Sequence, residues 1–216
     1  HSSPVIWKDK IFVTCTERDT GTMMFLCLKT GDGSVRWKRT YTIETHRQNR
    51  DNSFASATPA LDKDRIYYYW ASPETINVLA LDHGGKEVWR RSFDGFKSMH
   101  GSGPSPCLYK DLLIVPNDQM GPSSLFALDS KTGKTRWTLK RESGRAAYAT
   151  PCIYTPENGK PQLVFSSTAS GISGISPETG TRIWEYTDAF PQRVVASPIA
   201  AGDIIIGTCG QGGRGV

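Results

Sequence analysis

The stretch Ala127-Leu128-Asp129-Ser130-Lys131-Thr132-Gly133-Lys134-Thr135-Arg136-Trp137 is the clearest copy of a phrase that recurs along this chain. In every copy a glycine precedes a tryptophan by four residues, and a Ser-Pro or Thr-Pro pair recurs in step with it. A long period with turn residues at constant offsets is typical of a repeat architecture. The glycine–tryptophan pairs are Gly33 and Trp37, Gly85 and Trp89, Gly133 and Trp137, and Gly180 and Trp184.

The third repeat indicates what one unit looks like. Short apolar or alternating runs occupy 107–109, 112–115, 124–128 and 135–140, separated by turns at 110–111 and 131–133 and by a loop at 117–122. Four strands joined by short connections predict an antiparallel meander. Because no stretch has a clear 3.6-residue apolar period, we expect few or no helices.

A four-stranded sheet of this size does not bury both of its faces by itself, so repeated sheets have to pack on one another. Packing around an axis gives an all-β propeller of four-stranded antiparallel blades, whose repeat length matches this one. We expect one partial propeller domain over 1–216, with blades at about 1–55, 56–103, 104–148 and 149–195 and a half blade at 196–216. The chain would then be about four and a half blades of a seven- or eight-bladed propeller.

The repeated tryptophans have two interpretations. In the first they fill the space between neighbouring blades, with each glycine providing a turn of positive φ. In the second they are stacking platforms for a cofactor or a base. Four equivalent tryptophans, one in each repeat, favour the structural role, which we call tryptophan docking.

Composition excludes some functions. The chain has 38% apolar residues and a net charge of +5, and no run approaches the ~20 apolar residues that span a bilayer. Nucleic-acid binding is disfavoured because no aromatic motif is interleaved with the basic residues. Many of these follow the repeat tryptophans, where we expect them to solubilise the outer blade edges: Arg36, Lys38, Arg39, Arg90, Arg91, Arg136, Lys140 and Arg141.

The cysteines occupy equivalent places in different repeats, often where another repeat has alanine, valine or isoleucine. This pattern predicts small apolar residues rather than a disulfide framework or a metal site. They are Cys15, Cys27, Cys107, Cys152 and Cys209.

The longer and more polar loops should emerge together on one face, since they join second to third strands or one blade to the next. Scaffold proteins carry their binding groups on such loops. Each candidate has a plainer alternative: 46–52 as a solvated loop, the histidines as ordinary polar residues, and Asn117-Asp118 as a turn former rather than a catalytic base or Ca²⁺ ligand. The Gly-rich segment 210–215 is only a weak match to a phosphate loop. The candidate binding face is His46, Arg47, Asn49, Arg50, Asp51, His100, Asn117, Asp118, Arg145, Tyr148 and Arg193.

The pattern Ala127-x-Asp129-x-x-Thr132-Gly133-x-x-x-Trp137 resembles the docking motif of the pyrroloquinoline-quinone (PQQ)-type propeller repeat. That family includes quinoprotein alcohol dehydrogenases and the propeller lipoprotein of the outer-membrane barrel-assembly machinery. Other copies depart from it, with Lys29 and Ser176 in place of the aspartate. The resemblance implies a propeller, typically eight-bladed, in the periplasm or cell envelope of a bacterium.

For activity the resemblance implies less. The quinoprotein dehydrogenases carry two adjacent cysteines, a calcium ion held by Glu, Asn and Asp, and an aspartate base. No adjacent cysteine pair occurs here, and no acidic residue aligns with a catalytic motif. We therefore expect no catalytic residues, no metal ligands and no cofactor, with PQQ and Ca²⁺ as the alternative.

Three hypotheses follow for function. The first is a non-catalytic binding or scaffold module of the envelope, whose partners are a protein or envelope polymer and the remaining blades of the propeller. The second is a fragment of a PQQ-dependent alcohol or sugar dehydrogenase. The third is a polysaccharide or polyanion binder that uses exposed arginines, named as Arg47, Arg50, Arg145 and Arg193.

Overall fold

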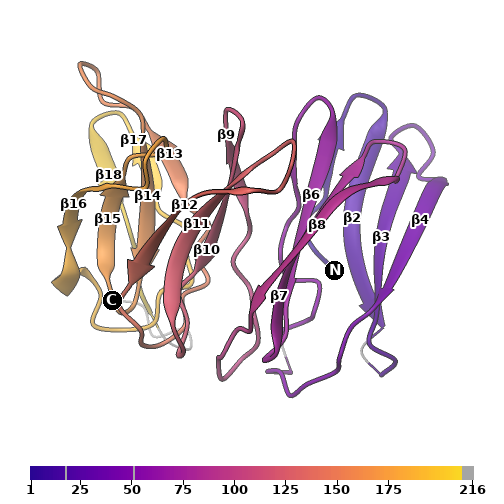
Figure 1. Ribbon diagram of the computed structural model, residues 1–216, viewed down its shortest axis with the longest axis horizontal. Coiled ribbons are helices and arrows are strands. Elements are labelled where there is room, and N and C mark those ends of the chain that lie inside the picture. The colour runs from indigo at the N-terminus through magenta and orange to yellow at the C-terminus, as the bar shows by residue number, and fades with distance from the viewer. Residues whose placement is uncertain (18, 51, 211–216) are drawn as a thin grey trace. The chain divides into compact units, whose positions relative to one another are not determined.

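A computed structural model describes residues 1–17, 19–50 and 52–210. Over these residues the chain consists of β-strands, turns and loops, with one 3₁₀ turn at Thr187–Ala189 and no α-helix. By its contacts it divides into two compact units, His1–Leu108 and Tyr109–Val216 (Figure 1).

The first unit holds two four-stranded antiparallel sheets in simple sequential order. One is β1 (Val5–Trp7), β2 (Lys10–Glu17), β3 (Thr22–Lys29) and β4 (Val35–Thr42). The other is β5 (Ala60–Leu61), β6 (Arg65–Ala71), β7 (Thr75–Asp82) and β8 (Glu87–Asp94).

The second unit follows the same plan. Its first sheet takes β9 (Cys107–Tyr109), which begins just before the unit boundary, with β10 (Leu112–Asn117), β11 (Ser123–Asp129) and β12 (Thr135–Arg141). Its next is β13 (Cys152–Tyr154), β14 (Gln162–Ser167), β15 (Gly171–Ile175) and β16 (Arg182–Tyr186). The last described strands, β17 (Ile199–Ala201) and β18 (Ile204–Ile206), form a two-stranded sheet.

The prediction of four-stranded antiparallel meanders is confirmed, and each four-stranded sheet lies within one of the predicted repeats. One boundary was wrong. Asn117, expected in a loop, is the last residue of β10, because it pairs with Ser124 of β11.

The core of the first unit lies between its two sheets. Phe25 of β3 stacks on Tyr68 of β6 with ring centroids 4.0 Å apart, and Phe12 and Leu79 belong to the same buried cluster. Strand β6 is buried along almost its whole length, as expected of an inner strand covered on both faces. Each such aromatic or aliphatic side chain contributes about 1.5–3 kcal/mol through burial.

The glycine of each repeat turn has positive φ: 69° at Gly33, 83° at Gly85, 71° at Gly133 and 71° at Gly180. This left-handed region is costly for residues with a Cβ atom. The glycine closes a tight turn between the third and fourth strands, where each sheet also shows a register shift beside the residue that pairs with the tryptophan.

Two repeat tryptophans contact the corresponding turn of the next sheet. The indole N–H of Trp37 donates to the carbonyl oxygen of His83 at 3.0 Å, and that of Trp137 donates to the carbonyl oxygen of Pro177 at 2.8 Å. Trp184 instead donates to Gln162 of its own sheet at 2.6 Å. A docking role for all four tryptophans therefore stays a prediction.

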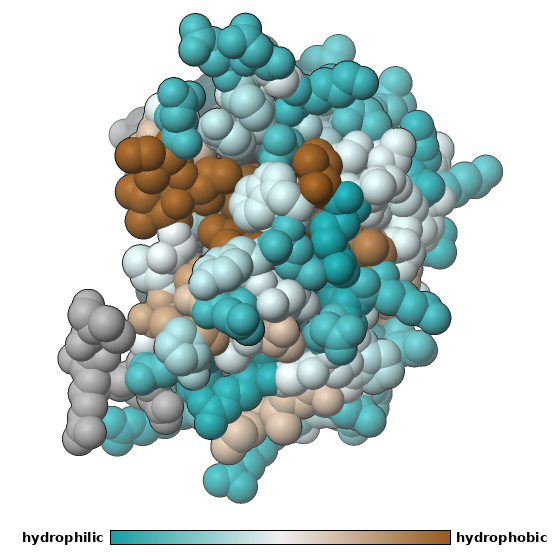
Figure 2. All heavy atoms as spheres, turned by 90° about the vertical axis from the view of Figure 1, so that its left-hand side faces the viewer, coloured by the Kyte–Doolittle hydropathy of each residue, from teal (hydrophilic) through white to brown (hydrophobic). Residues whose placement is uncertain are grey.

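The two-stranded sheet exposes apolar side chains. Ile199 and Ile204 are 61% and 64% exposed, and Ile206 is 47% exposed. Figure 2 looks onto the side of the molecule where Figure 1 labels β16 to β18, and it shows hydrophobic side chains gathered in one area.

Candidate functional site

In the first unit, hydrogen bonds join the two long loops that the sequence singled out. The Nδ2 amide of Asn52 donates to the carbonyl oxygens of His100 at 2.7 Å and Ser102 at 3.1 Å. The backbone N–H of Asn49 also donates to the carbonyl oxygen of His100, at 3.4 Å, and the Asn49 amide lies 3.3 Å from the His100 ring. Two candidate residues, Asn49 and His100, are thus brought together.

A glycine makes this approach possible. Gly101 has a φ of 88°, and a Cβ atom placed there would lie 2.9 Å from Nε2 of Gln48 and 3.0 Å from Nδ2 of Asn52. The loops therefore meet over a backbone position that accepts only glycine without strain. Asn52 belongs to the polar loop 46–52 that the sequence indicated, but no sequence pattern singled out Asn52 or Gly101 as the residues that hold this contact.

The other candidates of this unit lie beside the contact. His46 packs its ring edge against Phe54, with centroids 4.9 Å apart, and Arg47 and Arg50 are exposed. Asp51 lies outside the described residues.

In the second unit, Asp118 forms a buried ion pair with Arg141. The guanidinium donates from Nε to Oδ1 at 2.9 Å and from Nη2 to Oδ2 at 3.1 Å, and its Nη1 donates to Ser173 Oγ of the neighbouring sheet at 2.9 Å. The side chains of Arg141 and Asp118 are 0% and 6% exposed. A charge-assisted bidentate pair of this kind fixes both groups.

This arrangement corrects two predictions. Arg141, which we expected at the solvated outer edge, is buried because it bridges β12 to the next sheet. Asn117 and Asp118, which we expected on an exposed binding face, are 6% and 5% exposed. Both carboxylate oxygens of Asp118 already accept hydrogen bonds from Arg141, so the residue does not fit a Ca²⁺ ligand or a solvent-facing base.

The remaining candidates, Arg145, Tyr148 and Arg193, lie in segments that backbone hydrogen bonds hold in place. The N–H of Ala147 donates to the carbonyl oxygen of Asp118 at 3.1 Å, and the N–H of Tyr148 donates to the carbonyl oxygen of Val194 at 3.3 Å. Arg145 is exposed, whereas Tyr148 and Arg193 are half-buried. Tyr148 and Arg193 thus lie in neighbouring backbone segments.

The described residues include no group of three or more His, Cys, Asp or Glu side chains with a geometry that could hold a metal ion. The cysteines described are all free thiols, and burial raises the pKa of Cys27 and of Cys152. A raised pKa favours the protonated thiol, which is a weak nucleophile.

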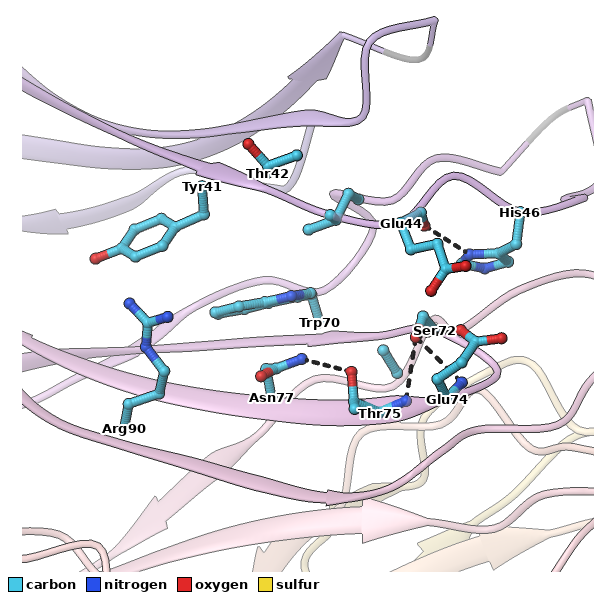
Figure 3. Close-up of a pocket in the computed structure, with 12 residues that line it drawn as sticks. Tyr41, Thr42, Glu44, His46, Trp70, Ser72, Glu74, Thr75, Asn77 and Arg90 are labelled. Carbon is cyan, nitrogen blue, oxygen red and sulfur yellow. Dashed lines mark hydrogen bonds between the residues drawn. The ribbon is translucent and has the colours of Figure 1, made fainter.

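A cleft lies between the two sheets of the first unit, and of the candidate residues only His46 lines it. It has a volume of ≈ 280 Å³. Figure 3 shows Tyr41 and Arg90 at one end, Glu44, His46 and Glu74 at the other, and Trp70 between them. No sequence motif signals it, because its walls come from β4, β6, β7, β8 and two loops.

Contacts within the cleft orient its side chains. The Arg90 guanidinium lies 4.7 Å from the centre of the Tyr41 ring and pairs with Glu87 at 2.7 Å. Burial, and after it the negative charge of Glu87, raises the pKa of Tyr41, so its phenol stays neutral at physiological pH. At the other end, Ser72 donates to a carboxylate oxygen of Glu74 at 2.9 Å.

Comparisons with known proteins agree on the fold. Residues 26–214 match the family model described as outer membrane protein assembly factor BamB. No protein with a curated description matches the sequence at a significant level. No helix in the described part of the chain has the length and hydrophobicity to cross a membrane.

Solved structures similar to this one include a BamB protein and two dehydrogenases. BamB from Moraxella catarrhalis aligns with a TM-score of 0.60 at 16% identity, over 94% of this chain and 53% of that one. Quinohemoprotein alcohol dehydrogenase from Comamonas testosteroni aligns with a TM-score of 0.64 at 18% identity, over 93% and 37%. A europium-containing methanol dehydrogenase aligns with a TM-score of 0.63 at 15% identity, over 91% of this chain and 43% of that one.

At these identities the likeness shows the fold alone: an all-β, propeller-type structure, of which this chain corresponds to a part. The chain spans about half or less of the length of these solved structures.

Proposed function

Since the chain belongs to the family of outer membrane protein assembly factor BamB, we propose that it is a non-catalytic binding module of the bacterial cell envelope. In this proposal a protein or envelope polymer binds the loops of the first unit that carry Asn49 and His100, or the loops of the second unit that carry Arg145 and Tyr148. The proposed localisation, in the periplasm or cell envelope, comes from the family resemblance.

The observation that supports this proposal best is the Asp118–Arg141 pair. Asp118 was the acidic residue that the sequence offered as a base, and the structure pairs it fully in a buried site. Breaking a buried pair to release a base would leave an uncompensated charge, at a cost of about 3–5 kcal/mol. Asp118 is thus better suited to fixing the loops than to proton transfer.

The cross-braced loops support binding in a second way. Hydrogen bonds from Asn49 and Asn52 hold the two long loops of the first unit together. A surface ordered before association loses less conformational entropy when a partner binds.

We also propose that the repeat tryptophans serve the scaffold and not a ligand. The Trp37 and Trp137 indoles are occupied by the turn of the following sheet, through a hydrogen bond to its backbone. The same two rings also lie against Gly85 and Gly180 of the following sheet, which leaves less room there for a stacked cofactor.

A polyanion binder is the second candidate, because Arg47, Arg50 and Arg145 are all exposed. Such binding depends strongly on salt, since it neutralises several phosphate or sulfate groups at once. Partner binding that weakens more than about tenfold between 50 and 200 mM salt would favour this candidate.

Site-specific photo-cross-linking tests the proposal. A photoreactive amino acid is placed at Arg47 or Arg145 on the loops, and in controls at Lys63 or Lys131, which are exposed on the opposite set of turns. We expect one discrete cross-linked envelope component from the loop positions and none from the control positions. Equal cross-linking from both sets, or none from the loops, would contradict the proposal.

A further inference from the structure

The cleft between the two sheets of the first unit combines a shaped volume with unused hydrogen-bonding groups. Its ≈ 280 Å³ is slightly below the range of roughly 300–1,000 Å³ of sites for drug-sized molecules, so it suits one ring of a larger ligand. The wall is aromatic, with the Tyr41 and Trp70 rings 5.9 Å apart at an interplanar angle of 37°.

Trp70 provides the observation that points to a ligand. Its side chain is only 7% exposed, and no described residue accepts a hydrogen bond from its indole N–H, which is not among the buried unpaired polar atoms and so reaches open space. An indole with an apolar body and an accessible N–H can donate to an acceptor that enters the cleft. Because Trp70 lines the cleft, an acceptor atom of a bound molecule would complete it.

The end of the cleft away from Tyr41 and Arg90 offers hydrogen-bond acceptors. The Glu44 carboxylate has no hydrogen-bond partner among the described residues, and one oxygen of Glu74 has none either. Glu74 is held by Ser72, and Asn77 is held between Thr75 and Ser92, so these groups are oriented in advance.

These groups select the charge of the ligand. An anion is disfavoured because Glu44 and Glu74 are not paired with a cation, whereas Arg90 is already paired with Glu87. A simple cation would satisfy the carboxylates but leave the indole donor of Trp70 unmatched. Hydroxyl groups donate to carboxylates and also accept from N–H groups, so a neutral polyhydroxyl ligand matches both the two carboxylates and the Trp70 indole.

We propose that this cleft binds a neutral sugar ring, with an apolar face of the ring against Tyr41 and Trp70 and its hydroxyls donating to Glu44 and Glu74. This deepens the proposed binding function by assigning a sugar-containing polymer to one surface. The residues of this cleft differ from the cross-linking positions. One proposal can therefore fail while the other stands.

The test follows the indole N–H signal of Trp70 by ¹H–¹⁵N NMR on the whole chain. The probes are methyl α-D-glucopyranoside, methyl β-D-galactopyranoside and N-acetylglucosamine, each titrated separately. Nα-acetyl-lysine amide is the cationic comparison. We expect a saturable shift of the Trp70 signal with at least one sugar, and a smaller one or none with the lysine derivative.

Variants locate the site. Glu44→Gln and Glu74→Gln should each weaken sugar binding about tenfold, since each replaces a hydrogen bond to a charged acceptor. Glu142→Gln, at an exposed glutamate of the second unit, should leave it unchanged. Thermal unfolding of each variant checks that the fold is intact.

Three results would overturn the proposal. One is no shift of the Trp70 signal with any of the three sugars up to about 100 mM, well above the millimolar constants that correspond to about 4 kcal/mol of binding. Another is a saturable shift with the lysine derivative alone, which would make the cleft a cation site. The third is sugar binding that neither glutamate variant changes, which would place the sugar elsewhere.

Discussion

The indole ring of Trp37 packs directly against Gly85 of the next sheet. A Cβ atom added to Gly85 would lie 2.8 Å from Cδ2 of the ring, and the same relation holds between Trp137 and Gly180, at 2.6 Å. The glycine therefore has two roles: it adopts a positive φ, and it leaves room for the tryptophan of the preceding sheet. This contact gives a physical reason why glycine and tryptophan recur together in the sequence.

Replacing Gly85 separates these two roles. Gly33→Ala is the matched control, because Gly33 has a similar φ of 69° but an added Cβ would meet nothing within 4 Å. We expect Gly33→Ala to cost about 1–2 kcal/mol from the backbone alone. Gly85→Ala should cost about 1–3 kcal/mol more, through overpacking against Trp37. Chemical denaturation measures both; equal losses would mean that the ring contact contributes nothing.

Loss of Arg141 should strongly destabilise the second unit. Arg141→Met leaves Asp118 buried and unpaired, with an expected loss of about 3–5 kcal/mol of unfolding free energy. Arg136→Met, on the same strand but with exposed ion pairs to Asp111 and Asp129, should lose less than about 1 kcal/mol. The double variant Asp118→Asn/Arg141→Met should recover part of the stability. A small effect of Arg141→Met would show that the pair is not structural.

Protonation of Asp129 in acid should lower the free energy of unfolding. Partial burial acts to raise the pKa of its carboxyl, but hydrogen bonds from the Thr132 hydroxyl and amide, the Lys131 amide and Arg136 outweigh it and lower the pKa below 3.8. A folded-state pKa below the unfolded value means that the stabilisation is present above pH 3.8 and is lost as pH falls through the folded value. Denaturation measured from about pH 5 to pH 2 should show this loss, and Asp129→Asn should flatten it. An unchanged pH profile in the variant would contradict this assignment.

The loop contact of the first unit should depend on Asn52. Asn52→Ala removes the hydrogen bonds to the carbonyl oxygens of His100 and Ser102, so hydrogen exchange at the Asn49 amide should become faster. Asn158→Ala, in an exposed loop of the second unit, is the control and should leave that amide unchanged. If exchange at Asn49 stays as slow as in the parent protein, another contact holds the loops.

Local pattern was sufficient to predict the sheets. The spacing of Gly133 and Trp137, the turns and the short apolar runs locate the strands of a meander, because strand, turn and strand are each encoded within a few residues. The family resemblance came from the same residues, and the family match supports it.

The site could not be predicted in the same way. Arg141 looks like a surface charge because it follows Trp137 among other basic residues. Only the approach of Asp118, just after β10, and of Ser173 in β15 makes it a buried residue. The cleft around Trp70 is likewise absent from any local pattern, since its walls come from two different sheets. Such pairings depend on tertiary packing, which a single sequence does not display.

The central claim, that this chain binds and does not catalyse, is tested most directly by titrating the purified protein with PQQ in the presence of Ca²⁺. Calorimetry measures quinone binding, and a redox dye then measures alcohol-dependent reduction. The account predicts no stoichiometric quinone binding and no dye reduction above the protein-free control. Quinone bound one to one, with alcohol-dependent dye reduction that a substitution at Asp118 abolishes, would contradict it.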